Sequence, residues 1–588
     1  MLKLLKRLTA KEWLAVLLSV AFVAGQVYLE LRIPDFMTNI TSLIPAGGTA
    51  AEIWNEGAKM LACALGSLAL AIIVGFFAAR ISAGFASNLR LEVFRKVLSF
   101  SMGEVNRFST ASLITRSTND VVQVQFLIAM GMQVVLRAPI MAVWALVKIA
   151  GKGTSEWTLA TGVAVIFIVL VISFISTLVV PRFRKIQTLT DNLNAITREN
   201  LTGLRVVRAY NAEKYQESKF RKANRALTGN YLFTTRTMSF MMPCMNLVMS
   251  GLPLSVYWIG SSLIDRAQAL DKLTLFSNMV VFSSYAMQVV MSFVMMVFIF
   301  VMLPRVLVSA RRINEVLDTP SSVLDGPGLA EISQELKGTV EFRDVSFKYP
   351  GAEDYVLKNI SFKAERGETV AFIGSTGSGK STIVNLIPRF YDATEGTVLV
   401  DGVDVRQYTL RQLRDRLGYI PQRSVMFSGT VSSNIAFGDN GKPEPEIEQI
   451  KYAAKIAQGD EFINKMEEGY DSRIAQGGAN VSGGQKQRLS IARAVCREPE
   501  IFIFDDSFSA LDFKTDKQLR RALNEELSDS TRLIVAQRIG TIRDADKIIV
   551  LENGQTVGIG THDELMRDCQ VYREIAYSQL SEEELKNA

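Results

Sequence analysis

Long apolar runs are concentrated in the N-terminal half of the chain, and they predict helices that cross a membrane. A helix of about 20 apolar residues spans the hydrocarbon core of a bilayer. Four of the six runs contain no charged residue, while the first has Glu30 at its outer edge and the third is interrupted by Arg137, next to Pro139. The runs are 14–31, 61–79, 126–147, 159–180, 238–264 and 273–303. The last two are longer than a bilayer requires, which predicts that they tilt or continue into water.

The basic residues between these runs predict the orientation of the helices. Segments rich in Lys and Arg remain on the cytoplasmic side of a membrane. The N-terminal segment contains four such residues, segment 80–123 contains six and segment 181–237 contains twelve, whereas each of the three loops on the opposite side contains two. We therefore expect both termini in the cytoplasm, together with two long intracellular loops whose pattern is helical.

The pattern changes after the sixth run. Residues 319–328 cluster Pro, Gly and Ser, which is typical of a linker. Beyond them, residues 339–349 alternate apolar and polar positions like an antiparallel strand, and residues 368–374 have the pattern of a buried strand. We predict an all-α transmembrane domain of six helices at 1–318, a linker at 319–338 and an α/β domain at 339–588.

Charge supports this division. The 588 residues include 65 Lys and Arg against 59 Asp and Glu, a net charge of +6. Residues 1–338 contain 33 basic and 20 acidic residues, a net charge of +13. Residues 339–588 contain 32 basic and 39 acidic residues, a net charge of −7. The basic part needs no nucleic-acid partner, because its charge is confined to cytoplasmic segments beside membrane lipid. Four scattered cysteines form no disulfide or metal-ligand pattern, and a single histidine excludes a histidine-cluster metal site.

The segment GSTGSGKS predicts a phosphate-binding loop between a strand and a helix. Its glycines let the backbone fold around phosphate groups, so that N–H groups face the anion. We expect Lys380 to reach the β- and γ-phosphates of ATP and Ser381 to coordinate Mg²⁺. The predicted nucleotide contacts of this segment are Gly374, Ser375, Thr376, Gly377, Ser378, Gly379, Lys380, Ser381 and Thr382.

Two further motifs extend the nucleotide site. The apolar strand IFIFD ends at Asp505, a position suited to a carboxylate that holds Mg²⁺ through water. Between it and the phosphate loop lies NVSGGQKQR, residues 480–488. At this point the chain resembles the ATP-binding cassette (ABC) proteins, whose signature motif is usually LSGGQ, with Val481 in place of the leucine.

The resemblance covers residues 339–588 and implies further roles. Tyr349 matches the aromatic residue that stacks on adenine. Gln422, in YIPQ, matches the Q-loop residue that also reaches Mg²⁺, and Asp512, in SALD, matches the D-loop. In this family the signature residues complete the nucleotide site of a partner chain; here they are Ser482, Gly483, Gly484 and Gln485.

With six preceding spans, the whole chain resembles a half-transporter of the type I ABC exporter class. The resemblance implies a multi-pass protein in the cytoplasmic membrane of a bacterium. Residues 106–120 and 199–210 resemble the intracellular loops whose short coupling helices dock on nucleotide domains.

Two positions depart from the family pattern. Asp506 stands where the family has the glutamate that polarises the attacking water, and Gln537, in AQR, stands where it has a histidine that contacts the γ-phosphate. The shorter side chain withdraws its carboxylate by more than about 1 Å, and misplacements of that size cost roughly 10²-fold in rate. Gln cannot carry a proton. His562 lies well beyond Gln537 in the sequence, at the start of a predicted surface helix, where a capping or surface role is expected. Gln476 also stands where many exporters of this family have a glutamate.

Paired losses of this kind resemble the degenerate subunit of bacterial heterodimeric exporters, many of them multidrug pumps. The resemblance implies a second half-transporter with the family's Glu and His as partner. It also implies that this chain's own Walker residues form a slow ATP site. The alternative is an active homodimer in which Asp506 serves as a weak base.

The transported molecule is less constrained by the sequence. Eleven of the 21 methionines lie between positions 238 and 302, and Met recurs on promiscuous binding surfaces. A cavity for small amphipathic molecules is one interpretation; packing against lipid is the other. Arg137 at membrane depth is a functional candidate whose partner would be an acidic group of a substrate or of the other chain, unless it lies nearer an interface. Alternatives to drug export are export of a lipid or peptide, and a regulatory subunit that does not pump.

Overall fold

We describe the protein from a computed structural model, which defines the structure of all residues except 45–47, 153, 269–270, 329–333 and 580–588. The chain forms two compact units. The first comprises Met1–Lys96 and Ala111–Thr319, and the second comprises Val97–Thr110 and Pro320–Ala588. Part of the predicted linker and the C-terminal segment from position 580 lie outside the described residues.

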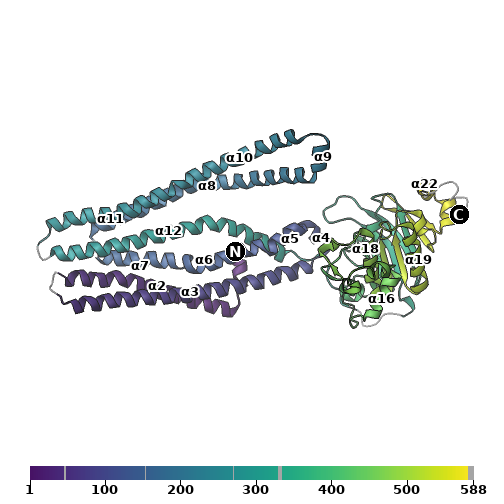
Figure 1. The fold of residues 1–588 in the computed structure, drawn as a ribbon, viewed down its shortest axis with the longest axis horizontal. Helices are drawn as coiled ribbons and strands as arrows, with labels where there is room; N and C mark the ends of the chain where they lie inside the picture. The colour runs from purple at the N-terminus through teal and green to yellow at the C-terminus, as the bar shows by residue number, and fades with distance from the viewer. Residues whose placement is uncertain (45–47, 153, 269–270, 329–333, 580–588) are drawn as a thin grey trace. The chain divides into compact units, whose positions relative to one another are not determined.

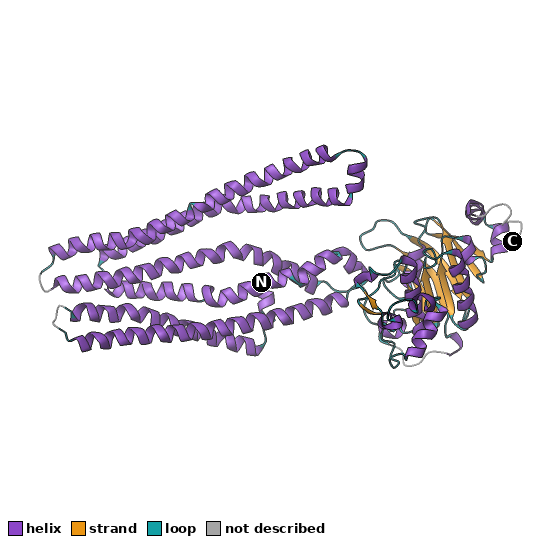
Figure 2. Ribbon diagram, in the orientation of Figure 1, coloured by secondary structure: helices purple, strands orange, loops and turns teal. Residues whose placement is uncertain are grey.

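The first unit is entirely helical in the described residues (Figures 1 and 2). Helices α8 and α10 pack against each other along their length and are joined at one end by the short helix α9. The helices of this unit are α1 (Leu2–Leu5), α2 (Ala10–Leu43), α3 (Ala50–Leu98), α5 (Thr110–Ser117), α6 (Asn119–Met130), the π-helix Gly131–Val135, α7 (Arg137–Lys152), α8 (Ser155–Thr202), α9 (Leu204–Ala209), α10 (Glu213–Ser239), α11 (Met241–Arg266) and α12 (Asp271–Asp318).

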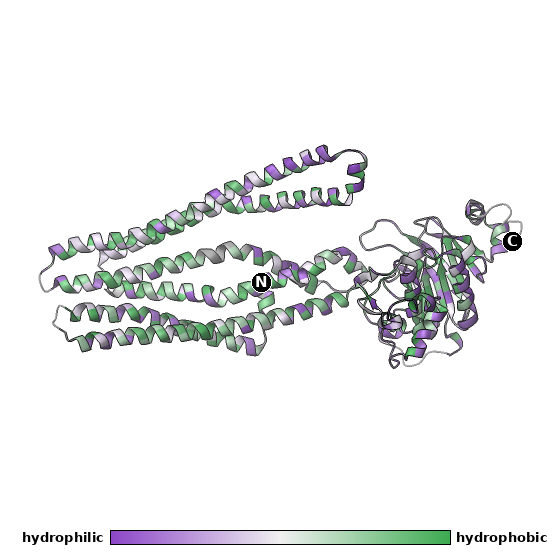
Figure 3. Ribbon diagram, viewed as in Figure 1, coloured by the Kyte–Doolittle hydropathy of each residue, from purple (hydrophilic) through white to green (hydrophobic). Residues whose placement is uncertain are grey.

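Six helical segments in the described residues are long and apolar enough to cross a membrane, in agreement with the six predicted runs. In the most apolar window of α3 only 11% of the residues are buried inside the protein. Apolar residues therefore cover much of the outer surface of these helices, while hydrophilic residues gather toward α9 (Figure 3). An exposed apolar surface of this extent is stable only in contact with lipid or another chain.

The first span is longer than the sequence pattern predicts. Helix α2 continues beyond position 31 to Leu43, and Pro34 lies inside it. Glu30 is therefore within a helix rather than at the edge of a span. The pattern failed because Glu30, Arg32 and Asp35 interrupt the apolar run, whereas the structure pairs each of them with another side chain.

The second unit contains two main sheets. The four-stranded sheet has the order β2-β1-β4-β5 and is antiparallel, and the six-stranded sheet has the order β12-β11-β3-β10-β9-β6. The alternating and buried strands predicted from the sequence correspond to β1, β3 and β9. The strands are β1 (Val340–Phe347), β2 (Leu357–Ala364), β3 (Thr369–Gly374), β4 (Glu395–Val400), β5 (Val403–Asp404), β6 (Leu417–Ile420), β7 (Gly429–Thr430), β8 (Arg473–Ile474), β9 (Ile501–Asp505), β10 (Thr531–Val535), β11 (Lys547–Glu552) and β12 (Gln555–Gly560).

Helices pack around the six-stranded sheet, whose strand β9 is completely buried. The helices of this unit are α4 (Met102–Phe108), α13 (Lys380–Leu386), α14 (Leu410–Arg414), α15 (Val431–Ile435), α16 (Ile447–Ile456), α17 (Asp460–Ile463), α18 (Gly483–Cys496), α19 (Phe513–Glu526), α20 (Ile539–Ile542), α21 (His562–Asp568) and α22 (Gln570–Gln579), with 3₁₀ turns at Gln334–Leu336, Gly469–Asp471 and Gln476–Gly478.

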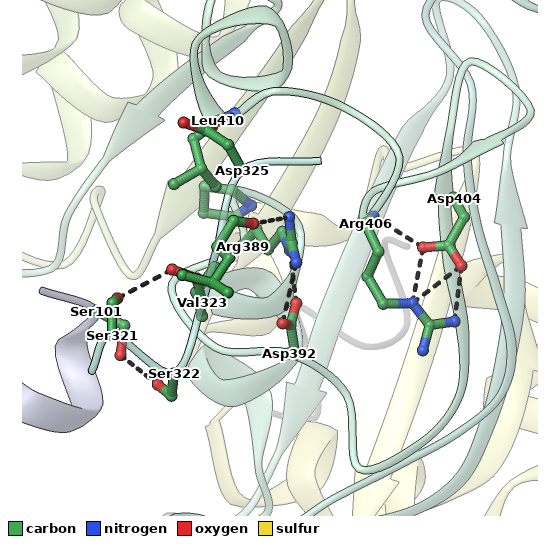
Figure 4. A network of polar contacts seen from close by, with 12 residues as sticks. Ser101, Ser321, Ser322, Val323, Asp325, Arg389, Asp392, Asp404, Arg406 and Leu410 are labelled. Carbon is green, nitrogen blue, oxygen red and sulfur yellow. Dashed lines mark hydrogen bonds and ion pairs between the residues drawn. The ribbon is translucent and has the colours of Figure 1, made fainter. Parts of the chain in front are cut away.

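The described part of the predicted linker is fixed to the second unit (Figure 4). The carboxylate of Asp325 accepts a hydrogen bond from the backbone N–H of Leu410 at 2.7 Å, and the guanidinium of Arg389 donates to the carbonyl of Leu324 at 2.8 Å. Arg389 is itself held by the carboxylate of Asp392. Residues 320–328, called the strap below, are therefore held in a defined position by the rest of the second unit.

The strap also holds helix α4, which comes from the first predicted intracellular loop. The hydroxyls of Ser101 and Ser322 lie 2.8 Å apart, and the carboxylate of Glu104 accepts the backbone N–H of Ser322. The amide of Asn106 donates to the hydroxyl of Tyr391 at 3.0 Å. The loop that begins in the membrane helices thus contacts the same unit as the predicted nucleotide site.

Candidate nucleotide site

Four parallel strands bring the predicted site residues to one edge of the sheet. Strand β10 pairs with both β3 and β9, so that Val535 is opposite Phe372 on one side and Asp505 on the other. Strand β6 pairs with β9 on its far side. Because the carboxyl ends of parallel strands meet at a common edge, the segments that follow them lie together, and such edges are the usual ligand sites of α/β sheets.

The phosphate loop follows β3 and uses glycines where a side chain would be strained. Gly374, Gly377 and Gly379 have φ values of 157°, 85° and 99°. A Cβ on Gly374 would meet the Leu551 carbonyl at 2.1 Å, whereas one on Gly377 would meet no atom within 4 Å. The loop therefore packs closely against the backbone of Leu551 at Gly374, whereas at Gly377 there is open space beside it.

Lys380 is buried against this loop. Its Nζ donates to the carbonyls of Gly374 and Ser375, both at 2.8 Å. Burial lowers the pKa of Lys380 from its ordinary value, while the carboxylates of Asp506 and Asp505 act in the opposite direction. The ammonium group is thus held at the loop by two backbone carbonyls.

The predicted Mg²⁺ residues lie in contact. The hydroxyl of Ser381 donates to Asp505 at 2.6 Å. Burial and the neighbouring Asp506 raise the pKa of Asp505, while the hydrogen bond from Ser381 opposes that shift. No group of three or more His, Cys, Asp and Glu side chains in the described residues could hold a metal ion by itself. A Ser381–Asp505 site fits Mg²⁺ that also takes oxygen ligands from phosphates and water.

The two departures from the family pattern meet at one carboxylate. Oδ2 of Asp506 accepts a hydrogen bond from Nε2 of Gln537 at 2.8 Å and another from Nε2 of Gln422 at 3.1 Å. Asp506 is 7% exposed and has a φ of 50°. The structure therefore joins Asp506, Gln537 and Gln422 in one hydrogen-bonded group beside the phosphate loop.

Tyr349 lies near the other end of the loop. Its hydroxyl is 3.0 Å from the Thr382 hydroxyl, and its ring packs edge-on against Tyr391 at 5.2 Å. Tyr349 is partly exposed, which leaves part of the ring accessible for the stacking role that the sequence predicts.

The signature residues form a separate feature. Ser482 caps helix α18, since its hydroxyl accepts the N–H of Gln485 at 3.3 Å and its own N–H donates to the Gln485 side chain at 2.8 Å. A Cβ on Gly483 would meet no atom within 4 Å. Asp512 caps α19 through the N–H of Thr515. These side-chain hydrogen bonds are local, and within the described residues none of them reaches the phosphate loop of the same chain.

One contact at this site was not predicted. The hydroxyl of Ser424, which follows Gln422 closely in the sequence, donates to the side chain of Gln487 at 2.8 Å. Gln487 belongs to α18, so this bond ties the Q-loop to the signature helix. The sequence signal was weak, because QRS and GGQKQ contain several polar residues and only the tertiary structure selects this pair.

The structure corrects the expectation for His562. The side chain is buried, and its Nδ1 lies 2.7 Å from the hydroxyl of Tyr572. Thr561, not His562, is the cap of helix α21, in a capping box with Glu564. His562 therefore has a packing role inside the domain rather than a capping or surface role, since it is buried and contacts Tyr572 of α22.

Comparison with known proteins identifies the family. Residues 16–306 match the family described as ABC transporter transmembrane region, and residues 357–509 match the family described as ABC transporter. A relative described as an uncharacterized ABC transporter ATP-binding protein of Mycobacterium tuberculosis is 39% identical over 553 residues, which cover 94% of this chain and 93% of the relative. The chain belongs to the ABC transporter family. Its two matched regions and six apolar spans make it an exporter-type half-transporter of the bacterial cytoplasmic membrane, with an ATP-binding domain.

Other relatives of this ABC transporter extend the comparison. The ATP-dependent lipid A-core flippase of Pseudomonas aeruginosa is 34% identical over 502 residues, covering 84% of this chain and 79% of the flippase. Among solved structures, a bacterial Atm1-family ABC exporter with ATP bound matches with a TM-score of 0.76 and 26% identity, covering 98% of this chain and 99% of that one. The predicted fold class is confirmed.

Proposed function

We propose that this ABC transporter is the catalytically impaired half of a heterodimer that exports small amphipathic molecules. The observation that carries the proposal is the hydrogen-bonded group of Asp506, Gln537 and Gln422. The carboxylate that would polarise water is one methylene shorter than the family's glutamate, and one of its oxygens already accepts two amide hydrogen bonds.

Two physical effects make this group a poor base. The shorter side chain holds its carboxylate back from the water it would polarise, and Oδ2 is already occupied by the amide donors of Gln537 and Gln422. Gln537 keeps the same protonation state at all accessible pH values, so it cannot donate charge to a phosphate as a protonated histidine does. Together these effects predict binding of nucleotide with slow hydrolysis at this chain's own phosphate loop.

The remaining residues support binding. When bound, ATP would supply the phosphoanhydride bond, and Mg²⁺ would supply positive charge that offsets the negative charge of the phosphates. The loop from Gly374 to Gly379 offers backbone N–H groups, Lys380 offers a positive charge and Ser381 offers a hydroxyl ligand beside Asp505. The position of these groups after strands β3 and β9 supports binding of the phosphates.

A second chain is required for the competent site. The side chains of Ser482 and Gln485 each accept a hydrogen bond from the other's backbone N–H and do not reach the phosphate loop of their own chain, which is consistent with a role of this segment at the partner's ATP. Helix α9 has no buried residue, and Leu204 and Val206 in it are exposed. An exposed apolar helix at the end of a polar loop is a surface for another protein.

The proposal predicts the hydrolysis rate of the full-length chain purified without a partner. We expect little ATPase activity from the wild-type chain, although ATP binds. The double substitution Asp506→Glu, Gln537→His should raise the rate by about 10²-fold, because it restores the length of the carboxylate and a protonatable side chain. The rate of phosphate release in lipid nanodiscs measures the ATPase activity of both the wild-type and the doubly substituted chain.

Lys380→Ala in the double-substituted chain is the control, and it should remove the gained activity. Vigorous hydrolysis by the wild-type chain alone, abolished by Lys380→Ala, would favour the active homodimer and contradict the proposal. Purification from native membranes supplies a second readout, since the co-purified chain should carry Glu and His at the positions of Asp506 and Gln537.

Lipid export is the second candidate function. It is favoured by the similarity to the lipid A-core flippase of Pseudomonas aeruginosa. Stimulation of the assembled transporter's ATPase by phospholipid or lipid A, without stimulation by hydrophobic drugs, would select it.

A further inference from the structure

The helices α2, α7 and α12 line a half-open cavity of about 340 Å³, and an ion pair forms part of its lining. Glu30 comes from α2, Arg137 from α7 and Gln288 from α12. Helix α2 continues from Glu30 to its end at Leu43, and α7 runs from Arg137 to its end at Lys152. At a rise of about 1.5 Å per residue, both residues lie about 20 Å along the helix from these ends, inside segments long and apolar enough to cross a membrane.

Glu30 is fully engaged within the protein. Its Oε1 accepts hydrogen bonds from Gln26, Ser67 and Arg137, each at 3.0 Å. Its Oε2 accepts a hydrogen bond from Nη2 of Arg137 at 2.8 Å. The expected partner of Arg137, an acidic group of a substrate or of another chain, is therefore corrected: Glu30 of the same chain neutralises its charge.

Arg137 and Gln288 retain hydrogen-bonding capacity at the cavity. Only Nη2 of Arg137 contacts Glu30, and its Nε and Nη1 have no acceptor among the described residues. Oε1 of Gln288 is buried without a hydrogen-bond partner in the described part of the chain. A polar group left unpaired favours a ligand that supplies its missing hydrogen bond. The cavity thus presents unused donors on one side and an unused acceptor on another.

Two local irregularities place these groups. The π-helix Gly131–Val135 precedes Arg137 closely, and such turns shift the direction of the side chains that follow. Pro34 lines the cavity and lacks the N–H that would bond the carbonyl of Glu30, one turn earlier. The rest of the lining includes Ile33, Met141, Met291 and Met295, which provide an apolar and adaptable surface.

We propose that this cavity binds an uncharged molecule with an apolar body and an amide-type group, whose carbonyl accepts from Arg137 and whose N–H donates to Gln288. Charge balance decides the class of ligand. The Glu30–Arg137 pair is neutral as a whole, and an added anion or cation would leave an uncompensated charge in a region of low dielectric. A neutral group with both an acceptor and a donor satisfies the cavity without that cost.

The site deepens the proposed function, because it names the substrate class of the exporter. Its test needs no nucleotide. Loss of ligand binding would leave the proposal for Asp506 and Gln537 intact, and active hydrolysis by the chain alone would leave this site intact.

The experiment is binding of tritiated octanamide to the full-length chain in lipid nanodiscs, corrected with empty nanodiscs. Competition by methyl heptanoate, octanoate and octylamine compares an uncharged acceptor, an anion and a cation of similar size. We expect octanamide to bind best. Gln288→Met is nearly isosteric and lacks the acceptor. It should weaken the binding of octanamide about three- to tenfold, so that octanamide no longer binds better than methyl heptanoate. Gln187→Met, at an exposed position on α8, is the matched control and should change nothing.

Glu30→Gln tests the charge argument. It leaves the charge of Arg137 uncompensated, so octanoate should then bind better than octanamide. Preference of the wild-type chain for octanoate or octylamine would overturn the assignment of a neutral ligand. Equal binding to wild-type and Gln288→Met chains, or no binding above empty nanodiscs, would overturn the site.

Discussion

Asp506 illustrates how one methylene can change the role of a chain. The side chain follows the end of a buried strand, where the family has a longer acid, and its Oδ2 is held by Gln537 and Gln422. Catalytic groups must be placed to within fractions of an ångström, so the proposed function treats this shortened and doubly hydrogen-bonded carboxylate as a poor base. The neighbouring Asp505 keeps its contact with Ser381.

His562 leads to a prediction about pH. Burial lowers the pKa of His562, and nearby Arg543 lowers it further. The unfolded chain, with an ordinary pKa near 6.5, therefore binds a proton before the folded chain does as pH falls. The stability that neutral His562 contributes is present above about pH 6.5 and is lost below it. Between pH 7.5 and 5.5, the Tm of His562→Gln should fall less than that of the wild-type chain.

Tyr572→Phe provides the control for this prediction. It removes the hydroxyl that lies 2.7 Å from Nδ1 but leaves His562 buried, so the loss of stability at low pH should persist. Equal shifts of Tm in wild-type and His562→Gln chains would show that other groups control the pH dependence.

At the scale of elements, two glycine motifs have different physical requirements. The phosphate loop needs glycine for its own folding, because a Cβ on Gly374 would collide with the Leu551 carbonyl. The start of α18 does not, because a Cβ on Gly483 would lie in open space. The described residues of its own chain therefore leave room for a side chain at Gly483, and the proposed function assigns this position to the partner's ATP site.

These two glycines support a paired prediction. Gly374→Ala should lower both the Tm and the affinity of the purified chain for a fluorescent ATP analogue, at a cost of about 1–3 kcal/mol. Gly483→Ala should leave both unchanged, yet reduce the ATPase activity of the assembled transporter several-fold. A fall in Tm for Gly483→Ala as large as that for Gly374→Ala would contradict the separation.

At the scale of the whole molecule, the chain carries surfaces that another protein or lipid must cover. The membrane helices expose apolar side chains along their length, and α9 has no buried residue. Helix α4, by contrast, is anchored to its own nucleotide-binding unit through Ser101, Glu104 and Asn106. Within the described residues the two predicted intracellular loops therefore differ: α4 is hydrogen-bonded to residues of its own unit, whereas α9 has no buried residue.

A substitution in α9 tests this difference. Val206→Asp places a charge on the exposed apolar surface, so it should reduce recovery of the second half-transporter from native membranes at least several-fold. The Tm of the isolated chain should not change, because Val206 is 61% exposed. Asn194→Asp, an equal change of charge at an exposed position on α8, is the matched control. Undiminished recovery with Val206→Asp would exclude α9 from the interface.

The sequence by itself determined the six spans, the strand pattern around β1, β3 and β9, and the residues of the phosphate loop. These features are local: an apolar run long enough for a bilayer, an alternating strand and a glycine-rich turn each express their physical requirement within a short segment. The substitutions at Asp506 and Gln537 were equally visible.

Only the tertiary structure decided which distant residues meet. Glu30 and Arg137 are separated by 107 positions, and the sequence pattern placed Glu30 at the edge of a span because a charge normally ends one. His562 was expected at the surface because it lies at the start of a predicted surface helix, but it is buried against Tyr572 of α22. The contact of Gln537 with Asp506 depends on β10 lying beside β9. Such pairings are set by how helices and strands pack, since side chains far apart in sequence become neighbours only through the arrangement of whole elements.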